Sequence, residues 1–220
     1  MFDFDAATDG GNNANLTNSL TYAHTCSGSD RLLVVVVVGD VHAGADDVTG
    51  VTYSGVSMTA GPKLTTLTSG RYFYTFYLLN PASGANNVVV SSATAHYLLS
   101  GAASYTGVGA FDAQNTNTSL LDADGVLAST ITIGATDAWA ILFSFGFTDG
   151  SPATAGTGST RRGFDGTFGT WGIFDSNTAL GLGSYGMTFS YALSGSDMGA
   201  VLLSFGPAGV AARRFFLVPS

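Results

Sequence analysis

The chain has 220 residues, a formal net charge of −8 at pH 7 and 45% hydrophobic residues. This length can bury the core of one large β domain or two small ones, and the negative charge disfavours nucleic acid as a partner, because phosphate contacts need clustered lysine and arginine. All acidic residues are aspartate, glutamate is absent and Lys63 is the only lysine. Glutamate and lysine favour exposed helix faces whereas aspartate favours turns, so this composition, with its 30 glycines, predicts an all-β protein.

Features that would direct the chain to a membrane or an oxidising compartment are weak. The longest apolar runs fall far short of the roughly 20 residues that span a bilayer, so no membrane segment is expected. The single cysteine, Cys26, cannot form an intrachain disulfide or a cysteine-based zinc site. Residues 1–5 have neither the basic nor the apolar region of a signal peptide. If Met1 is the native start, this favours assembly in a host cytoplasm, and the alternative is an extracellular protein that was trimmed or exported by another route.

The first part of the chain contains the most distinctive strand. Residues 1–14 alternate phenylalanine with aspartate and then become rich in glycine and asparagine, which predicts an N-terminal arm. Residues 15–26 keep apolar side chains largely at alternate positions and predict a strand with one buried face. Residues 32–38 are seven uninterrupted aliphatic residues, five of them valine. Such a run predicts a central strand that is covered on both faces.

The middle of the chain continues as a meander. Residues 51–59 have the form of a tight hairpin, and residues 71–79 predict a second strand without a solvated face. Further strands are predicted at 87–92 and 96–105. The stretch 107–121 contains a polar run and predicts a long connection instead of a strand.

The last part of the chain alternates strands with loops. Residues 148–168 are rich in glycine, serine and threonine and predict a long functional or mobile loop. The tail 208–220 is apolar enough to need a partner surface. Further strands are predicted at 127–133, 138–145, 169–174, 184–192 and 198–205.

About twelve short strands, with no clean internal repeat and no dividing linker, predict one domain. We expect a single two-sheet antiparallel β-sandwich, jelly-roll-like, over residues 15–207. The arm (1–14) and the tail (208–220) lie outside it.

Catalytic and metal-binding patterns are weak. The three histidines, His24, His42 and His96, are not spaced as a metal site or triad, and His24 falls on the buried face of its strand. Residues 122–125 and the aspartates at 40, 46 and 47 offer oxygen atoms to calcium, but neither group completes an EF-hand pattern, and Asp-Gly is common in turns. No cofactor and no resident metal are therefore expected, and a polysaccharide-cleaving enzyme that uses aspartate pairs is the weakest hypothesis.

The loop before residue 171 offers the components of a binding site. An aromatic platform with polar neighbours is typical of carbohydrate sites, although a tryptophan within a strand more often belongs to the core. The candidate binding residues are Asp149, Arg161, Arg162, Asp165 and Trp171.

Several segments together resemble an uncharacterised β-sandwich module found in phage structural proteins and in bacterial surface proteins. The segments are residues 28–35, 48–59, 77–84 and 88–90, and the resemblance extends over roughly residues 15–112 and more weakly over 199–205. These are scaffold motifs, namely a strand opener, a hairpin and a turn, and the resemblance implies no catalytic residues.

The sequence therefore predicts a non-enzymatic virion structural protein of a tailed phage, either a capsid decoration protein or a tail or fibre component. Its partners would be other virion proteins and copies of itself in a symmetric homo-oligomer. The alternative is a glycan-binding module that recognises a host surface through the loop at 149–171. The candidate intersubunit residues are Phe2, Phe4, Arg213, Arg214, Phe215, Phe216 and Leu217.

Overall fold

The computed structural model describes residues 1–12, 16–39, 46–65, 71–122, 125–146, 152–165, 170–192 and 196–209. These residues form strands and turns and no helix, which confirms the predicted all-β class. Within the same ranges there is accordingly no apolar helix long enough to cross a membrane.

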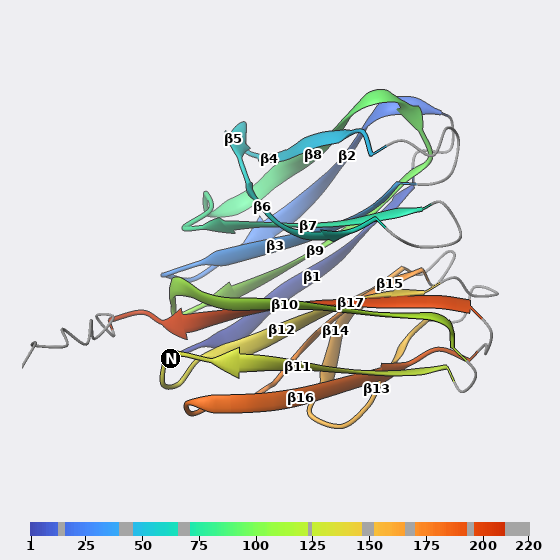
Figure 1. The fold of residues 1–220 in the computed structure, drawn as a ribbon. Coiled ribbons are helices and arrows are strands. Elements are labelled where there is room, and N and C mark those ends of the chain that lie inside the picture. The colour runs from blue at the N-terminus through green and yellow to red at the C-terminus, as the bar shows by residue number, and fades with distance from the viewer. Residues whose placement is uncertain are drawn as a thin grey trace, which may run out of the picture.

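The N-terminal half of the chain forms two antiparallel sheets (Figure 1). Sheet A has the order β1-β9-β3-β7-β6 and sheet B has the order β2-β8-β4-β5. The strands of sheet A are β1 (Asp3–Asn12), β9 (Leu98–Thr106), β3 (Leu32–Gly39), β7 (Tyr72–Leu79) and β6 (Thr59–Leu64). The strands of sheet B are β2 (Thr17–Cys26), β8 (Gly84–His96), β4 (Val48–Tyr53) and β5 (Val56–Ser57).

The C-terminal half forms two further sheets. Sheet C has the order β10-β17-β12-β15-β14 and sheet D has the order β11-β16-β13. The strands of sheet C are β10 (Val108–Asp122), β17 (Ser196–Pro207), β12 (Trp139–Gly146), β15 (Trp171–Asp175) and β14 (Thr160–Phe164). The strands of sheet D are β11 (Val126–Ile133), β16 (Gly183–Ser190) and β13 (Thr154–Ala155).

The two halves repeat one topology. Sheet C follows the strand order of sheet A, with β10 in the place of β1 and β17 in the place of β9, and sheet D follows the order of sheet B. The register agrees as well, because β1 and β10 each carry a bulge at the aspartate of a Phe-Asp-Ala segment, at residues 4–6 and 111–113. The sequence shows no clean repeat, but the fold is an internal duplication.

A single residue, Gly107, joins the last strand of the first half to the first strand of the second. Its N–H donates to the Ser29 carbonyl at 3.2 Å, and its carbonyl accepts a hydrogen bond from the Ala208 N–H at 2.9 Å. Gly107 has φ of +70°, and a Cβ at this position would lie 1.9 Å from the Met1 carbonyl oxygen. Only glycine fits this junction, which holds the halves without a flexible linker.

The four sheets are stacked in the order B, A, C, D, as Figure 1 shows from top to bottom. Three clusters of buried hydrophobic residues fill the spaces between successive sheets. The middle cluster joins the halves, since it contains side chains of sheet A and of sheet C. The predicted two-sheet architecture is therefore wrong in the number of sheets.

The valine strand β3 lies inside this stack, and all eight of its residues are buried. Val34 and Val36 belong to the cluster shared with sheet C, whereas Val35 and Val37 belong to the cluster shared with sheet B. Successive side chains of a strand point to opposite faces, so an uninterrupted apolar run serves two cores. The prediction that this strand is covered on both faces is confirmed.

Three predicted non-strand segments form strands instead. The arm at 1–14 contains β1, which pairs with β9, and the connection at 107–121 contains most of β10, which pairs with β17. The loop at 148–168 contains β13 and β14. The two long strands β1 and β10 each lie at the edge of a sheet, where polar residues are tolerated, so their sequences lack the apolar pattern of interior strands.

Candidate functional site

The predicted aromatic platform, Trp171, lies in the core between sheets A and C. Its side chain is fully buried, and its ring packs directly against Gly101 of β9, where a Cβ would come within 1.9 Å of the indole Cη2. A ring in this position has no free face to stack on a sugar.

Asp165 directly follows β14 and is bonded to Thr170. It is 1% exposed, and its Oδ2 accepts hydrogen bonds from the Thr170 N–H at 3.1 Å and the Thr170 hydroxyl at 2.7 Å. These bonds tie together the two ends of the segment 166–169. Asp165 therefore has a structural partner within the chain.

Arg162 forms an ion pair within sheet C and also contacts the N-terminal half through Phe4. Its Nε donates to Asp175 Oδ2 at 2.6 Å, a second nitrogen bonds to Asn177, and its guanidinium lies 4.6 Å from the ring centroid of Phe4 on β1. Asp175 is fully buried. Burial raises the pKa of the Asp175 carboxyl, and the hydrogen bond and charge of Arg162 oppose that shift.

Arg161 lies at the surface on the same strand. Its Nη1 donates to the Ala153 carbonyl at 2.7 Å, and its guanidinium stacks 4.5 Å from the centroid of the Phe164 ring, which is 38% exposed. The structure therefore exposes Arg161, leaves Arg162 partly exposed and buries Asp165 and Trp171. Asp149 lies outside the described residues, and the other four do not form one exposed site.

The aromatic residues of the predicted arm pack within the chain. Phe2 is 4% exposed and stacks on Trp139 with a centroid distance of 4.8 Å. Phe4 meets Tyr105 edge to face at 5.8 Å and also lies under Arg162. In this fold both rings serve the core that joins sheets A and C, and they do not form a free intersubunit surface. The other candidate intersubunit residues, at positions 213–217, lie outside the described residues.

His24 is a buried structural residue, as the sequence predicts. It is 1% exposed, and its Nδ1 forms a hydrogen bond of 2.9 Å with the Thr8 hydroxyl on β1. Burial lowers the pKa of His24 to about 4, although the nearby Asp5 carboxylate acts in the opposite direction. The ring is therefore neutral at physiological pH.

No group of three or more metal-ligating side chains occurs within the described part of the chain. Asp46, one of the candidate calcium ligands, pairs with Lys63 and accepts a hydrogen bond from the Tyr74 hydroxyl at 2.9 Å. Asp47 accepts a hydrogen bond from the Thr94 N–H at 3.2 Å. Of the remaining positions, 40, 42 and 124 and the side chains at 96 and 122 lie outside the described residues.

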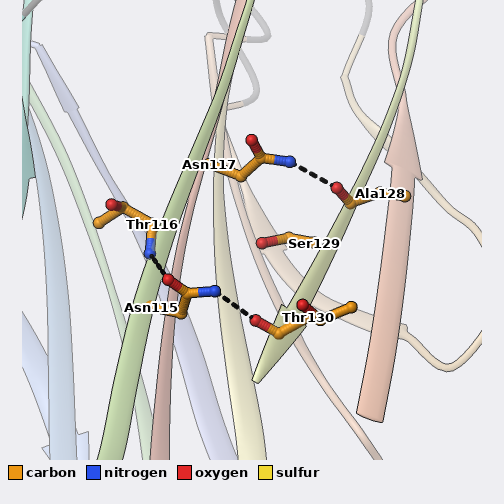
Figure 2. A pocket seen from close by; sticks show the side chains of 6 residues that line it. All are labelled: Asn115, Thr116, Asn117, Ala128, Ser129 and Thr130. Atoms are coloured by element: carbon orange, nitrogen blue, oxygen red, sulfur yellow. Dashed lines mark hydrogen bonds between the residues drawn. The ribbon is translucent and has the colours of Figure 1, made fainter. Parts of the chain in front are cut away.

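The structure shows a polar groove that the sequence analysis missed. It has a volume of about 300 Å³ and lies between β10 of sheet C and β11 of sheet D (Figure 2). The alternation of asparagine with threonine from position 115 to 118 is the sequence signal that could have indicated a polar strand here. The lining residues are Asn115, Thr116, Asn117, Ala128, Ser129 and Thr130.

Two asparagine side chains bridge the groove in the manner of a β-ladder. Asn115 Nδ2 donates to the Thr130 carbonyl at 2.7 Å, and Asn117 Nδ2 donates to the Ala128 carbonyl at 2.6 Å. These carbonyls belong to an edge strand, so the amides satisfy groups that would otherwise be open to pairing with another chain.

No protein-family model matches the chain, and no curated protein matches it. Among solved structures, the ANX2 ectodomain from Arabidopsis thaliana aligns over 87% of this chain and 82% of its own, with 10% identity and a TM-score of 0.30. The major capsid protein P2 from bacteriophage PM2 aligns over 94% and 98%, with 10% identity and a TM-score of 0.28. The ANX1 ectodomain from Arabidopsis thaliana aligns over 89% and 85%, with 8% identity and a TM-score of 0.29. The similarity to a phage capsid protein and to plant ectodomains is weak, and it assigns none of their roles to this chain.

Proposed function

We propose that this chain is a non-enzymatic virion structural protein of a tailed phage, either a capsid decoration protein or a tail or fibre component. The observation that carries the proposal is the continuous packing of four sheets through three hydrophobic clusters, with a one-residue junction between the halves. A stack of this kind is a rigid block, which suits a protein whose role is to hold other subunits in position.

Three strongly buried side chains that could serve as an acid or a base support a structural role, because each is bonded to a partner within the fold. Asp175 pairs with Arg162, Asp165 accepts a hydrogen bond from Thr170, and His24 is bonded to Thr8 on β1. A catalytic carboxylate or base needs to face a substrate. These three side chains face partners within the chain instead.

The proposed contacts with other subunits now rest on the C-terminal tail. Phe2 and Phe4 pack within the chain, so they no longer support an intersubunit role. The Ala208 N–H donates to the Gly107 carbonyl, and the basic and apolar residues at 213–217 begin four residues after the last described residue, Gly209. The tail is therefore the segment of choice for a test of self-association.

The test compares the full chain with a version that ends at Gly209, by light scattering coupled to gel filtration. The full chain is expected to form a defined oligomer and to occur at a fixed copy number in purified particles. The truncated chain is expected to be a folded monomer with the same unfolding midpoint. A full chain that is monomeric at every concentration and absent from particles would overturn the proposal.

A matched pair of tail variants separates apolar from charged contacts. Replacing both Phe215 and Phe216 by alanine is expected to abolish the oligomer, because buried aromatic anchors dominate interfaces. Replacing both Arg213 and Arg214 by alanine is expected to change mainly the salt dependence of association. If the aromatic pair can be removed without effect on the oligomer, the tail is not the contact.

The alternative glycan-binding role through residues 149–171 loses its main support. Its platform, Trp171, and its acid, Asp165, are buried, and only Arg161 of the described candidates is exposed. We therefore do not place a glycan site in this loop.

A further inference from the structure

The groove between β10 and β11 contains a buried hydroxyl that has no partner. Ser129 is 3% exposed, and its Oγ makes no hydrogen bond within the described part of the chain. In Figure 2 this hydroxyl points from β11 towards β10, between the side chains of Asn115 and Asn117. Because an unsatisfied buried hydroxyl costs free energy, it indicates that something else completes its hydrogen bonds.

The duplicated fold shows what stands at the same position in the other half. On β2, Tyr22 lies four residues before Cys26, which pairs with Gly84, the first residue of β8. On β11, Ser129 lies four residues before Ile133, which pairs with Gly183, the first residue of β16. Tyr22 is therefore the counterpart of Ser129.

The Tyr22 ring fills the equivalent space in the N-terminal half. A Cβ on Gly10 would lie 2.5 Å from the Tyr22 Cε1, so the ring rests against the backbone of β1, and its hydroxyl is 2.9 Å from the Ser100 hydroxyl. In the C-terminal half Ser129 takes the place of Tyr22, Asn117 that of Gly10 and Ala200 that of Ser100. Both the ring and the partner of its hydroxyl are thus missing, and the groove lies in that place.

The groove is held in a defined shape by its own hydrogen bonds. Both ends of the Asn115 amide are engaged, since Nδ2 donates to the Thr130 carbonyl and Oδ1 accepts from the Thr116 N–H at 2.9 Å. The Asn117 amide nitrogen is held by Ala128. Side chains that are positioned before binding lose little entropy when a ligand arrives.

We propose that this groove binds a neutral, hydroxyl-rich ligand of the size of one sugar ring. All six lining residues are uncharged and offer amides, hydroxyls and methyl groups, so the groove has no group that would neutralise a charge on a ligand. The net charge of −8 further disfavours anions. A volume of about 300 Å³ is at the lower end for small-molecule sites, which limits the ligand to a single ring.

In this arrangement the Ser129 hydroxyl exchanges hydrogen bonds with a ligand hydroxyl, and Asn117 Oδ1 accepts from another. This site goes beyond the structural role proposed above and does not depend on it. Its failure would leave the oligomer and particle measurements unchanged.

The test is a titration of the isotopically labelled full chain with neutral sugars, followed by NMR of the asparagine side-chain amides. The probes are glucose, galactose, N-acetylglucosamine and their methyl glycosides. Saturable shifts of the Asn115 and Asn117 amide signals are the expected result. Binding of the methyl glycosides as well as the free sugars indicates the end of a glycan chain, and binding of the free sugars alone indicates a small-molecule ligand.

The blocked variant copies the N-terminal half by combining Ser129→Tyr, Asn117→Gly and Ala200→Ser. It is expected to bind at least about tenfold more weakly, since it loses the cavity and the two hydrogen bonds. Ser129→Ala, which removes only the hydroxyl, is a second variant for the case that the triple variant does not fold, and it is also expected to weaken binding. Tyr22→Phe, at the counterpart position, is the control and should bind as the unmodified chain does. Absence of saturable shifts, or equal shifts in the Ser129→Ala variant, would overturn the proposal.

Discussion

Asp5 and Asp112 occupy the same position in the two halves of the molecule and share two equivalent hydrogen bonds, while Asp5 accepts one more from the Ser27 hydroxyl. Each lies at the bulge of the first strand of its half, and each accepts a hydrogen bond from a serine on the last strand, Ser104 at 2.7 Å and Ser204 at 2.8 Å. Each also accepts a backbone N–H from the segment that follows the second strand, at 2.8 Å and 3.0 Å. One carboxylate thus joins three parts of the chain in each half.

Replacing Asp5 or Asp112 by alanine is expected to lower the free energy of unfolding by about 1–3 kcal/mol in each case, because the hydroxyl and N–H groups lose their acceptor. The effect should be similar in the two halves, and chemical denaturation measures it. Asp3→Ala, at an exposed position, is the control and should change stability by less than about 0.5 kcal/mol. A large loss in only one half would show that the two carboxylates are not equivalent.

Stability is expected to fall as the pH is lowered from 7 to 4, mainly because of His24. Burial lowers the pKa of His24 to about 4, below its usual value of 6.5, so the folded state resists protonation that the unfolded state accepts. The stabilisation is complete above pH 6.5 and is lost as the pH falls towards 4, by about 3 kcal/mol in total.

Denaturation curves at several pH values test this expectation. His24→Gln, which does not titrate, should flatten the dependence between pH 6.5 and 4. A residual loss at lower pH is expected from Asp5. Burial would raise the pKa of its carboxyl, but hydrogen bonds from Ser27 and Ser104 lower it overall, so this stabilisation is present above about pH 4. An unchanged slope in the glutamine variant would show that His24 is not the group responsible.

Arg162→Ala is expected to destabilise the fold by about 3–5 kcal/mol, because it leaves the buried Asp175 carboxylate without its charged partner. Changing Asp175 to asparagine in the same chain should recover part of this loss, and a double-mutant cycle measures the coupling. Burial raises the pKa of the Asp175 carboxyl, so as the pH falls the folded state takes up this proton more readily than the unfolded state does. The deficit of the Arg162→Ala variant should therefore be smaller near pH 4 than at pH 7, and a deficit independent of pH would argue against the charge as its cause.

Gly101→Ala is expected to weaken the contact between the two halves. The added Cβ would lie 1.9 Å from the Trp171 ring, and overpacking of this kind costs about 1–3 kcal/mol. Gly50→Ala is the matched control, because Gly50 also lies in a strand and has open space around the added Cβ, so it should be neutral or slightly stabilising. Trp171→Phe should partly rescue Gly101→Ala, and thermal unfolding compares the four variants. Equal unfolding temperatures for the two alanine variants would show that sheets A and C can move slightly apart without a loss of stability.

The sequence by itself determined the strand content and the burial of the valine strand. Valine at Val34 to Val38 is stiff at χ1, and an apolar residue at every position leaves no face for water, so the strand and its two covered faces follow from local chemistry. The burial of His24 followed in the same way, from its place in an alternating strand.

Only the tertiary structure decided the number of sheets, the duplication of the fold and the place of the polar segments. The strand β1 is polar along much of its length, and it is a strand because β9, almost a hundred residues away, offers it a partner. Such long-range pairing leaves little trace in local periodicity, so the sequence predicts an arm at 1–14 and a connection at 107–121 where the structure has strands. The groove at Ser129 was also decided at this level, because it depends on the absence of a ring that the other half of the chain retains at Tyr22.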